Sequence, residues 1–410
     1  MIVLGAGIVG TSIALNLAKR GLAVALVDRG GVGEGTSYGN AGIIEGNTVF
    51  PPAFPSDWAT LARIALKRSP LANYHLAHLP RVAPWLIAFH AASRPERLVE
   101  TAQLMRPLFA RAVAEHEALA AEAGAERYFS RNGWLKLYRS DEALAAQAPE
   151  LELAAKFGIS ATPLDRDGAL TLEPALAAVF RHGVHWSGAV SVSNPLALTR
   201  AYAARFTALG GIALEGDARS LHRAGAQWRV ETTFGPVDAG DVVVALGPWA
   251  GDLLRPLGIN LPLAVKRGYH RHYRAQGNAT LGRPVLDAEN GYVLAPMEQG
   301  IRLTTGIEFA ARDAAPTPVQ LQRVEPAARA LFPLGSAVEP QPWLGARPCF
   351  ADSRPVISRA PRQRGLWLAC GHGHWGLTLG AATGRLIAEL MTGATPFCDP
   401  KPYSAERFVG

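Results

Sequence analysis

Cysteine and long apolar runs are scarce in this chain of 410 residues. Its three cysteines are Cys349, Cys370 and Cys398, and no two of them are spaced as C-x-x-C. The spacing favours neither a disulfide framework nor a thiolate metal site, so we expect reduced, buried thiols. No stretch approaches the roughly 20 uninterrupted apolar residues of a membrane-spanning helix. The first residues already resemble a strand, so we expect no signal peptide and a cytoplasmic location.

A concentrated block of charge is also missing. Lysine and arginine outnumber aspartate and glutamate by 41 to 34, giving a net charge of +7, but the arginines are scattered along the chain. Nucleic-acid-binding proteins usually gather their basic residues into a patch or stripe. We therefore expect no nucleic-acid partner, whereas attraction to an anionic substrate or membrane surface stays open.

A glycine fingerprint stands at the start of the chain. The apolar run Ile2-Val3-Leu4 leads into Gly5-Ala6-Gly7-Ile8-Val9-Gly10, and a second apolar run, 23–27, delivers Asp28. This is the dinucleotide-binding βαβ pattern: a strand, the G-x-G-x-x-G turn, a helix and an acidic residue after the second strand. In this pattern the pyrophosphate binds at the helix N-terminus and the acidic residue binds a ribose hydroxyl. NAD and FAD share the half that this pattern binds, so the fingerprint leaves both open.

The later pattern of elements indicates two domains, as the length also favours. Helices are expected at 58–69, 96–123, 196–209 and 377–391, buried strands at 241–246 and 366–369, and antiparallel strands at 263–273, 292–296 and 301–308. We predict an α/β protein. A Rossmann-type nucleotide-binding domain is assembled from discontinuous segments, 1–48, 165–260 and 345–410. An α+β substrate domain with an antiparallel sheet comprises 49–164 and 261–344.

Four stretches resemble one family of flavoproteins. They are Gly5 to Asp28, Thr36-Ser37-x-x-Asn40-Ala41-Gly42, Ala245-Leu246-Gly247-Pro248-Trp249, and Gly345-Ala346-Arg347-Pro348 through Gly371-His372-Gly373-His374-Trp375-Gly376. Their order and spacing are similar to those of the FAD-dependent amine and amino-acid oxidoreductases, which include D-amino-acid oxidase, glycine oxidase and sarcosine oxidase. Two of the motifs resemble in particular those of the small-subunit type of bacterial D-amino-acid dehydrogenase: Thr-Ser-x-x-Asn-Ala-Gly and the ending Gly-His-Gly-x-x-Gly.

The resemblance implies a bound FAD and argues against NAD. Some relatives attach the flavin covalently through a cysteine near the region of Cys349, but the register around Arg347-Pro348-Cys349 does not match, so we expect noncovalent FAD. The helix after Gly376 would direct backbone N–H groups at the negative charge of a reduced flavin. The expected cofactor-binding residues are Gly5, Gly7, Ile8, Val9, Gly10, Asp28, Arg29, Thr36, Ser37, Asn40, Ala41, Gly42, Ala245, Leu246, Gly247, Trp249, Gly371, His372, Gly373, His374, Trp375, Gly376, Leu377 and Thr378.

The resemblance also suggests a substrate site. Arg347 matches the family's Gly-x-Arg-Pro motif and is the expected clamp for a substrate carboxylate, because guanidinium offers two parallel donors. Tyr292 is expected to add a phenol hydrogen bond, and His374 to contact flavin or substrate. His270 and His372 are further candidates for the cavity wall. No acidic residue accompanies these histidines at metal-site spacing, so no metal is expected.

The implied reaction is FAD-dependent oxidative deamination of a small D-amino acid to a 2-oxo acid and ammonia, by hydride transfer from Cα to flavin N5. Electrons would pass to a quinone or an electron-transfer protein. The alternatives are oxidation of a secondary amino acid (D-proline, D-hydroxyproline, sarcosine or glycine) and a flavoprotein subunit of a larger electron-transfer complex. The helix at 58–68 is amphipathic; packing on its own domain and peripheral contact with the inner membrane face both fit.

Overall fold

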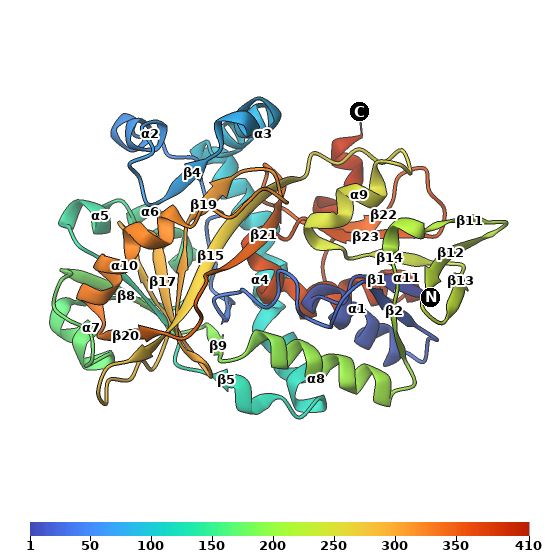
Figure 1. Cartoon of the computed structure of the whole chain (residues 1–410), viewed down its shortest axis with the longest axis horizontal. Helices are drawn as coiled ribbons and strands as arrows, with labels where there is room; N and C mark the ends of the chain where they lie inside the picture. Colours follow the sequence, from blue (N-terminus) through green and yellow to red (C-terminus); the bar gives the residue numbers. More distant parts are fainter. Residues whose placement is uncertain (410) are drawn as a thin grey trace.

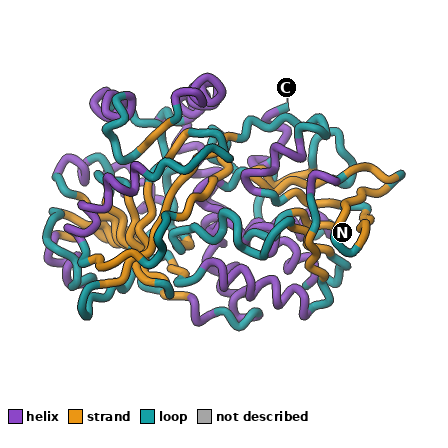
Figure 2. The backbone as a smooth tube through the Cα atoms, in the orientation of Figure 1, coloured by secondary structure: helices purple, strands orange, loops and turns teal. Residues whose placement is uncertain are grey.

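Two large β-sheets organise the protein, and the chain passes between them several times (Figure 1). The computed structural model describes residues 1–409. Figure 2 shows the strands gathered into two separate groups, with helices and loops between and around them.

The six-stranded sheet carries the glycine fingerprint. Its order is β10 (Ile212–Glu215), β2 (Ala25–Asp28), β1 (Ile2–Leu4), β14 (Val242–Val244), β23 (Leu366–Cys370) and β22 (Val356–Arg359). The first five strands are parallel, and β22 pairs with β23 in the antiparallel sense. All three residues of β1 and of β14 are buried, which is typical of parallel strands covered on both faces. The predicted Rossmann-type domain of discontinuous segments is therefore confirmed.

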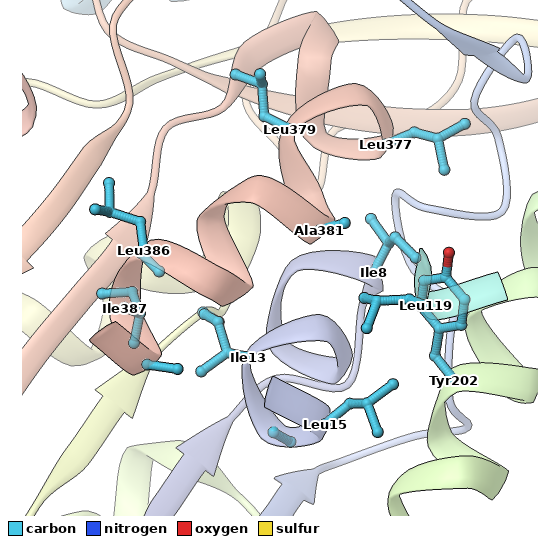
Figure 3. Close-up of a cluster of buried hydrophobic side chains, with 14 of the residues drawn as sticks. Ile8, Ile13, Leu15, Leu119, Tyr202, Leu377, Leu379, Ala381, Leu386 and Ile387 are labelled. Atoms are coloured by element: carbon cyan, nitrogen blue, oxygen red, sulfur yellow. The ribbon is translucent and has the colours of Figure 1, made fainter. Parts of the chain in front are cut away.

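Helix α1 (Ile8–Ala18) lies against α11 (Gly376–Thr392), the last helix of the chain. The contact is close because glycines face α1: a Cβ on Gly384 would lie 2.6 Å from the Ser12 carbonyl oxygen. Apolar side chains from both helices, with Leu119 and Tyr202 from α4 (Pro95–Glu122) and α8 (Pro195–Ala208), fill the core between them (Figure 3). Gly393, at φ +70°, ends α11 as expected of a helix C-terminus.

The larger sheet is mostly antiparallel and lies on the left in Figure 1. Its order is β4 (Ala72–Tyr74), β19 (Ile307–Phe309), β15 (Ala264–Ala275), β18 (Gly300–Thr305), β17 (Tyr292–Met297), β16 (Val285–Asp287), β6 (Trp134–Tyr138), β8 (His182–Trp186) and β7 (Ala161–Asp165), with β20 (Leu334–Ala337) and β21 (Trp343–Cys349) also pairing with β15. Only β16 with β6 and β19 with β4 pair in parallel among the strands of this sheet within residues 1–409.

Smaller elements complete the described chain. A hairpin sheet consists of β11 (His222–Ala224), β12 (Gln227–Thr232) and β13 (Gly235–Ala239), and a short sheet of β3 (Ile43–Ile44), β9 (Val190–Val192) and β5 (Phe129–Ser130). The remaining helices are α2 (Trp58–Ala65), α3 (Leu79–Ala92), α5 (Asp141–Ala145), α6 (Ala148–Lys156), α7 (Arg166–Leu172), α9 (Ala250–Leu254) and α10 (Val319–Leu331). No helix within residues 1–409 combines the length and apolar character needed to cross a membrane.

We propose that the six-stranded sheet and the larger sheet mark two domains with boundaries close to those expected from the sequence. Three segments depart from that division. Helix α4 lies in the range 49–164 but packs in the core with α1 and α11, and β21 lies mostly in the range 345–410 but pairs with β15 of the larger sheet. Strand β8 lies inside the range 165–260, yet it pairs with β6 and β7 of the larger sheet. We therefore place the second boundary after residue 186.

Candidate active site

A cavity of about 530 Å³ lies where the two sheets meet. One end is lined by residues that follow parallel strands of the six-stranded sheet, among them Gly5 after β1, Asp28 at the end of β2 and Leu246 after β14. The other end is lined by residues of the larger sheet, including Leu286, Val293 and Thr304. Ligands of open α/β sheets bind at the carboxyl ends of the parallel strands, which is where this cavity begins.

The turn between β1 and α1 depends on close backbone packing. Gly5 has φ +103°, and a Cβ on it would lie 2.5 Å from the Ala245 carbonyl oxygen. A Cβ on Gly10 would lie 1.8 Å from the Gly5 carbonyl oxygen. Gly7, Ile8 and Val9 line the cavity, whereas Gly10 does not and acts by letting α1 meet the turn.

Asp28 is held in a fixed orientation beside this turn. Its carboxylate accepts hydrogen bonds from the backbone N–H groups of Ala6, at 2.6 Å, and Gly30, at 3.0 Å. Arg29 also lines the cavity, with its guanidinium 4.6 Å from the ring centre of Trp249. A carboxylate fixed by backbone amides at the end of the second strand is placed to bind a ribose hydroxyl.

The loop from Thr36 to Gly42 is tied down at several points. The Ser37 hydroxyl accepts a hydrogen bond from the Ile8 backbone N–H at 3.0 Å, and the Thr36 hydroxyl donates one to the Ala346 carbonyl at 2.8 Å. Arg302 donates to the carbonyls of Tyr38, at 2.9 Å, and Asn40. The expected residues Thr36, Ser37, Asn40 and Ala41 line the cavity; Gly42 lies behind it.

A second helix N-terminus points into the same cavity. Strand β23 leads through a short 3₁₀ turn, Gly373–Trp375, into α11, whose first turn has no side-chain cap within the described chain. Gly373, His374, Gly376 and Leu377 line the cavity. Uncapped N–H groups at a helix start carry partial positive charge, so they favour an anionic ligand.

Three of the expected residues near α11 support this wall from behind. A Cβ on Gly371 would lie 2.1 Å from the Phe350 ring, and Trp375 packs edge-on against Phe109. The Thr378 hydroxyl donates to the Ile43 carbonyl at 3.1 Å, which joins β3 to the helix. None of the three is part of the cavity wall.

Arg347 faces the cavity from β21, opposite Lys266 on β15. Its guanidinium lies over Gly268, where a Cβ would lie 2.6 Å from Nη1, and Nη1 donates to the Gly306 carbonyl at 3.0 Å. Within residues 1–409 no carboxylate lies in ion-pair range of Arg347. Burial lowers the pKa of the Arg347 guanidinium. The donors that remain free are thus available to an anionic ligand.

The four expected histidine and tyrosine partners separate into two pairs. His372 and His374 line the cavity; the Nε2 of His372 is 3.0 Å from the Thr383 hydroxyl, and the Nε2 of His374 has no hydrogen-bond partner in the described chain. Burial lowers the pKa of His372 to about 4 and that of His374 well below its ordinary value, with Arg347 and Lys266 adding to the latter shift. Both rings are therefore neutral near pH 7.

Tyr292 and His270 are not brought to the cavity. The Tyr292 side chain is buried, and its hydroxyl donates to the Ala327 carbonyl at 3.3 Å. The His270 ring is buried against Trp343, with centroids 4.8 Å apart. On β17 the cavity-facing residue is Val293, so strand alternation turns Tyr292 toward α10 instead.

Many cavity residues were not expected from the sequence, among them Trp343 and Glu45. Trp343 lines the cavity with its indole over Gly39 and Gly345, where added Cβ atoms would lie 1.7 and 2.2 Å from the ring. Glu45 lines it from the segment after β3, on the same side of the chain as Ile43. The spacing of Ile43 and Glu45, two residues apart behind the Asn40-Ala41-Gly42 motif, was the signal that could have identified Glu45.

Comparisons with known proteins identify the family. The model of the FAD dependent oxidoreductase family, DAO, matches residues 1–390. The chain is 31% identical to a D-amino-acid oxidase of Bradyrhizobium diazoefficiens, covering 99% of this chain and 98% of that protein. It is 32% identical to D-amino acid dehydrogenase 2 of Ralstonia nicotianae, covering 99% of each. The crystal structure of glycine oxidase from Geobacillus kaustophilus shares the fold, with a TM-score of 0.78, 24% identity and coverage of 100% and 98%.

The chain therefore belongs to the DAO family and is an FAD-dependent oxidoreductase. The residues present fit that cofactor. Two helix N-termini meet one cavity, Gly5 and Gly7 allow close approach of a pyrophosphate, and the Asp28 carboxylate is fixed beside them. Among residues 1–409 no three His, Cys, Asp or Glu side chains are grouped as metal ligands.

Proposed function

We propose that this protein oxidises a small D-amino acid to the corresponding 2-oxo acid and ammonia. The observation that carries the proposal is Arg347, a cavity-facing guanidinium without a carboxylate partner in the described chain. The names of the two relatives, a D-amino-acid oxidase and a D-amino acid dehydrogenase, support an amino acid as the substrate.

Arg347 binds the substrate carboxylate in this proposal, and the cavity wall orients the rest of the molecule. Trp343 and Thr304 line the same cavity as Arg347. When bound, FAD supplies a two-electron acceptor for the hydride that leaves Cα. The carboxylate is bonded directly to Cα, so fixing it on Arg347 provides the orientation that hydride transfer needs. His374 is uncharged, so it lines the cavity as a neutral polar side chain and does not add a second positive charge beside Arg347.

We propose that FAD is held without a covalent bond. Cys349 is buried, and its thiol contacts the Arg347 carbonyl oxygen at 3.6 Å. Burial also raises the pKa of this thiol, which disfavours the thiolate needed for attachment. Cys349 does not line the main cavity.

The alternative substrates are secondary amino acids such as D-proline, D-hydroxyproline and sarcosine, or glycine, and glycine oxidases are among the relatives. For the electron acceptor we propose a quinone or an electron-transfer protein, in keeping with the dehydrogenases among them. The second candidate is a flavoprotein subunit of a larger electron-transfer complex, with little activity alone.

The decisive measurement is an anaerobic visible spectrum of the purified protein before and after addition of single D- and L-amino acids. We expect a flavin spectrum that bleaches with D-isomers and not with their L-isomers. Bleaching by glycine, sarcosine or proline alone would move the substrate class to those compounds. A flavin that no amino acid reduces would contradict the proposal and favour the partner-dependent subunit.

A lobe formed by α2 and α3 supports peripheral membrane contact (Figure 1, top). Four large apolar side chains are exposed on it: Trp58 by 85%, Leu66 by 63%, Leu76 by 67% and Ile87 by 71%. Residues 58–94 contain five lysines and arginines and no acidic residue. Apolar side chains surrounded by basic ones suit an anionic lipid surface, and such contact would bring the enzyme to a lipid-soluble quinone.

We expect the protein to sediment with anionic lipid vesicles, less so at high salt, and to leave zwitterionic vesicles in the supernatant. The double variant Trp58→Ser and Ile87→Ser should lose this binding with its FAD content unchanged. Phe234→Ser is the matched control, because Phe234 is 86% exposed on the other domain. Equal sedimentation of the double variant and the wild type would remove the lobe from this role.

A further inference from the structure

Glu45 is a carboxyl group inside the cavity that the proposed reaction has not used. It directly follows β3, and its backbone amide donates to the Thr378 hydroxyl at 3.3 Å, so it lies beside the first turn of α11. Its side chain lines the cavity, as does that of Arg347. The two groups come from different walls: Glu45 from the segment after β3, and Arg347 from the larger sheet.

No cation neutralises this carboxyl group. Within residues 1–409, no lysine, arginine or histidine lies in ion-pair range of Glu45. Its hydrogen-bond partner is the Thr48 hydroxyl, which donates to Oε2, and the Trp375 side chain is a second. A carboxylate partly enclosed in a cavity without a cation is costly, so its presence there favours a ligand that carries positive charge.

The surrounding charges are few. From β6, Lys136 faces Glu45 but is itself paired with Glu150 at 3.2 Å. From α4, Arg106 donates to the Gly46 carbonyl at 2.9 Å. Burial raises the pKa of Glu45, with Glu150 adding to the shift, while Thr48, Trp375 and Lys136 oppose it. A carboxylate whose pKa is raised is a better proton acceptor than an ordinary one.

An amino acid at neutral pH presents a carboxylate and an ammonium group. Among the charged groups of the cavity wall, the Arg347 guanidinium and the Glu45 carboxyl group have no ion-pair partner in the described chain and could match these two charges. Hydride can leave Cα only when the nitrogen has an electron pair to share with that carbon, so the ammonium must first lose a proton. Arg347 cannot accept that proton, and the cavity histidines are weak acceptors because burial lowers the pKa of both rings.

We propose that Glu45 binds the ammonium group of the substrate and takes its proton before hydride transfer. This inference rests on the proposed amino-acid oxidation. In the step, one N–H bond of the ammonium breaks and an O–H bond forms on the Glu45 carboxylate. The electron pair stays on nitrogen and moves into the C–N bond as the hydride leaves Cα. The hydride passes to bound FAD, and the iminium ion that results reacts with water to give the 2-oxo acid and ammonium.

The test is the pH profile of flavin reduction in Glu45→Gln. Near pH 7 we expect the rate to fall by about 100- to 10,000-fold, the usual contribution of a positioned acid or base. The rate should then rise with pH toward about pH 10, because the free amine becomes abundant in solution. Glu152→Gln, at an exposed position on α6, is the matched control and should keep the wild-type profile.

Thr48→Val separates proton transfer from a structural role. Removing the Thr48 hydroxyl removes a hydrogen bond that lowers the pKa of Glu45, so that pKa rises further. The acid limb of the rate profile should therefore move to higher pH, with the plateau rate unchanged. A purely structural role for Glu45 would change FAD content or stability and leave the position of the limb where it is.

Binding provides a readout without turnover. Acetate or propionate, carboxylates without an amine, should perturb the flavin band of Glu45→Gln at concentrations equal to or below those for the wild type. If a D-amino acid bleaches the wild type and Glu45→Gln bleaches equally fast at every pH, Glu45 is not the acceptor, and the proposed function stands. If no amino acid bleaches the wild type, both proposals are overturned.

Discussion

Replacement of Arg347 by alanine should raise KM for the amino-acid substrate by roughly 30- to 3,000-fold. The reason is that removing one partner of a buried, hydrogen-bonded charge pair costs about 2–5 kcal/mol. The substrate carboxylate would lose its only cationic partner on the wall formed by β21. The residues expected to bind the adenosine half of FAD are unchanged, so FAD should still bind. The measurement is steady-state kinetics together with the ratio of FAD to protein.

Two variants make this result specific. Arg347→Lys keeps the charge but loses the paired donors, so its KM should fall between those of the wild type and Arg347→Ala. Arg131→Ala removes an exposed arginine that pairs with Glu117 on the surface and should change nothing. An unchanged KM in Arg347→Ala, or a loss of FAD equal to the loss of activity, would show that Arg347 does not bind the carboxylate.

Replacement of Gly10 by alanine should yield a protein that retains little FAD. The new Cβ would lie 1.8 Å from the Gly5 carbonyl oxygen, closer than any real contact. Either α1 moves away from the turn or Gly5 leaves its conformation at φ +103°, and both displace the amides that approach the pyrophosphate. Overpacking of this kind costs about 1–3 kcal/mol in stability as well. The ratio of flavin to protein absorbance after purification measures the loss.

Gly240→Ala is the control for this substitution. Gly240 is exposed in the same domain, has no positive φ, and would have no heavy atom within 4 Å of an added Cβ. It should keep one FAD per chain and the wild-type melting temperature. Should Gly10→Ala also keep its full complement of FAD, the turn would not be the rigid support that the packing indicates.

The nucleotide end of the cavity was predictable from local sequence because its residues are adjacent in the chain. Gly5, Gly7 and the acid Asp28 belong to one βαβ unit, in which strand, turn and helix determine where each residue lies. The same is true of the turn between β23 and α11, where Gly373, His374 and Gly376 reach the cavity as expected. Short-range patterns are sufficient for such units.

The substrate end was less predictable because it depends on which face of a long strand meets the cavity. Strand alternation shows that Tyr292 and Val293 face opposite sides, but not which side is the cavity. Packing against α10 decides this, and it takes Tyr292 away. His270 is similarly enclosed by Trp343, whose position depends on the register between β15 and β21. Glu45 was missed because its two-residue spacing from Ile43 shows that the two residues share a face, but not that this face meets the cavity.

The order of strands in the six-stranded sheet has a consequence for synthesis of the protein. Neighbouring strands β1, β14 and β23 are separated by more than a hundred residues at each step along the chain. A ribosome must therefore translate nearly the whole message before the walls of the cavity exist, so the flavin is acquired after translation. Until then β14 has an unpaired edge that invites pairing with other chains. Availability of FAD during this interval would thus govern how much nascent protein matures and how much aggregates.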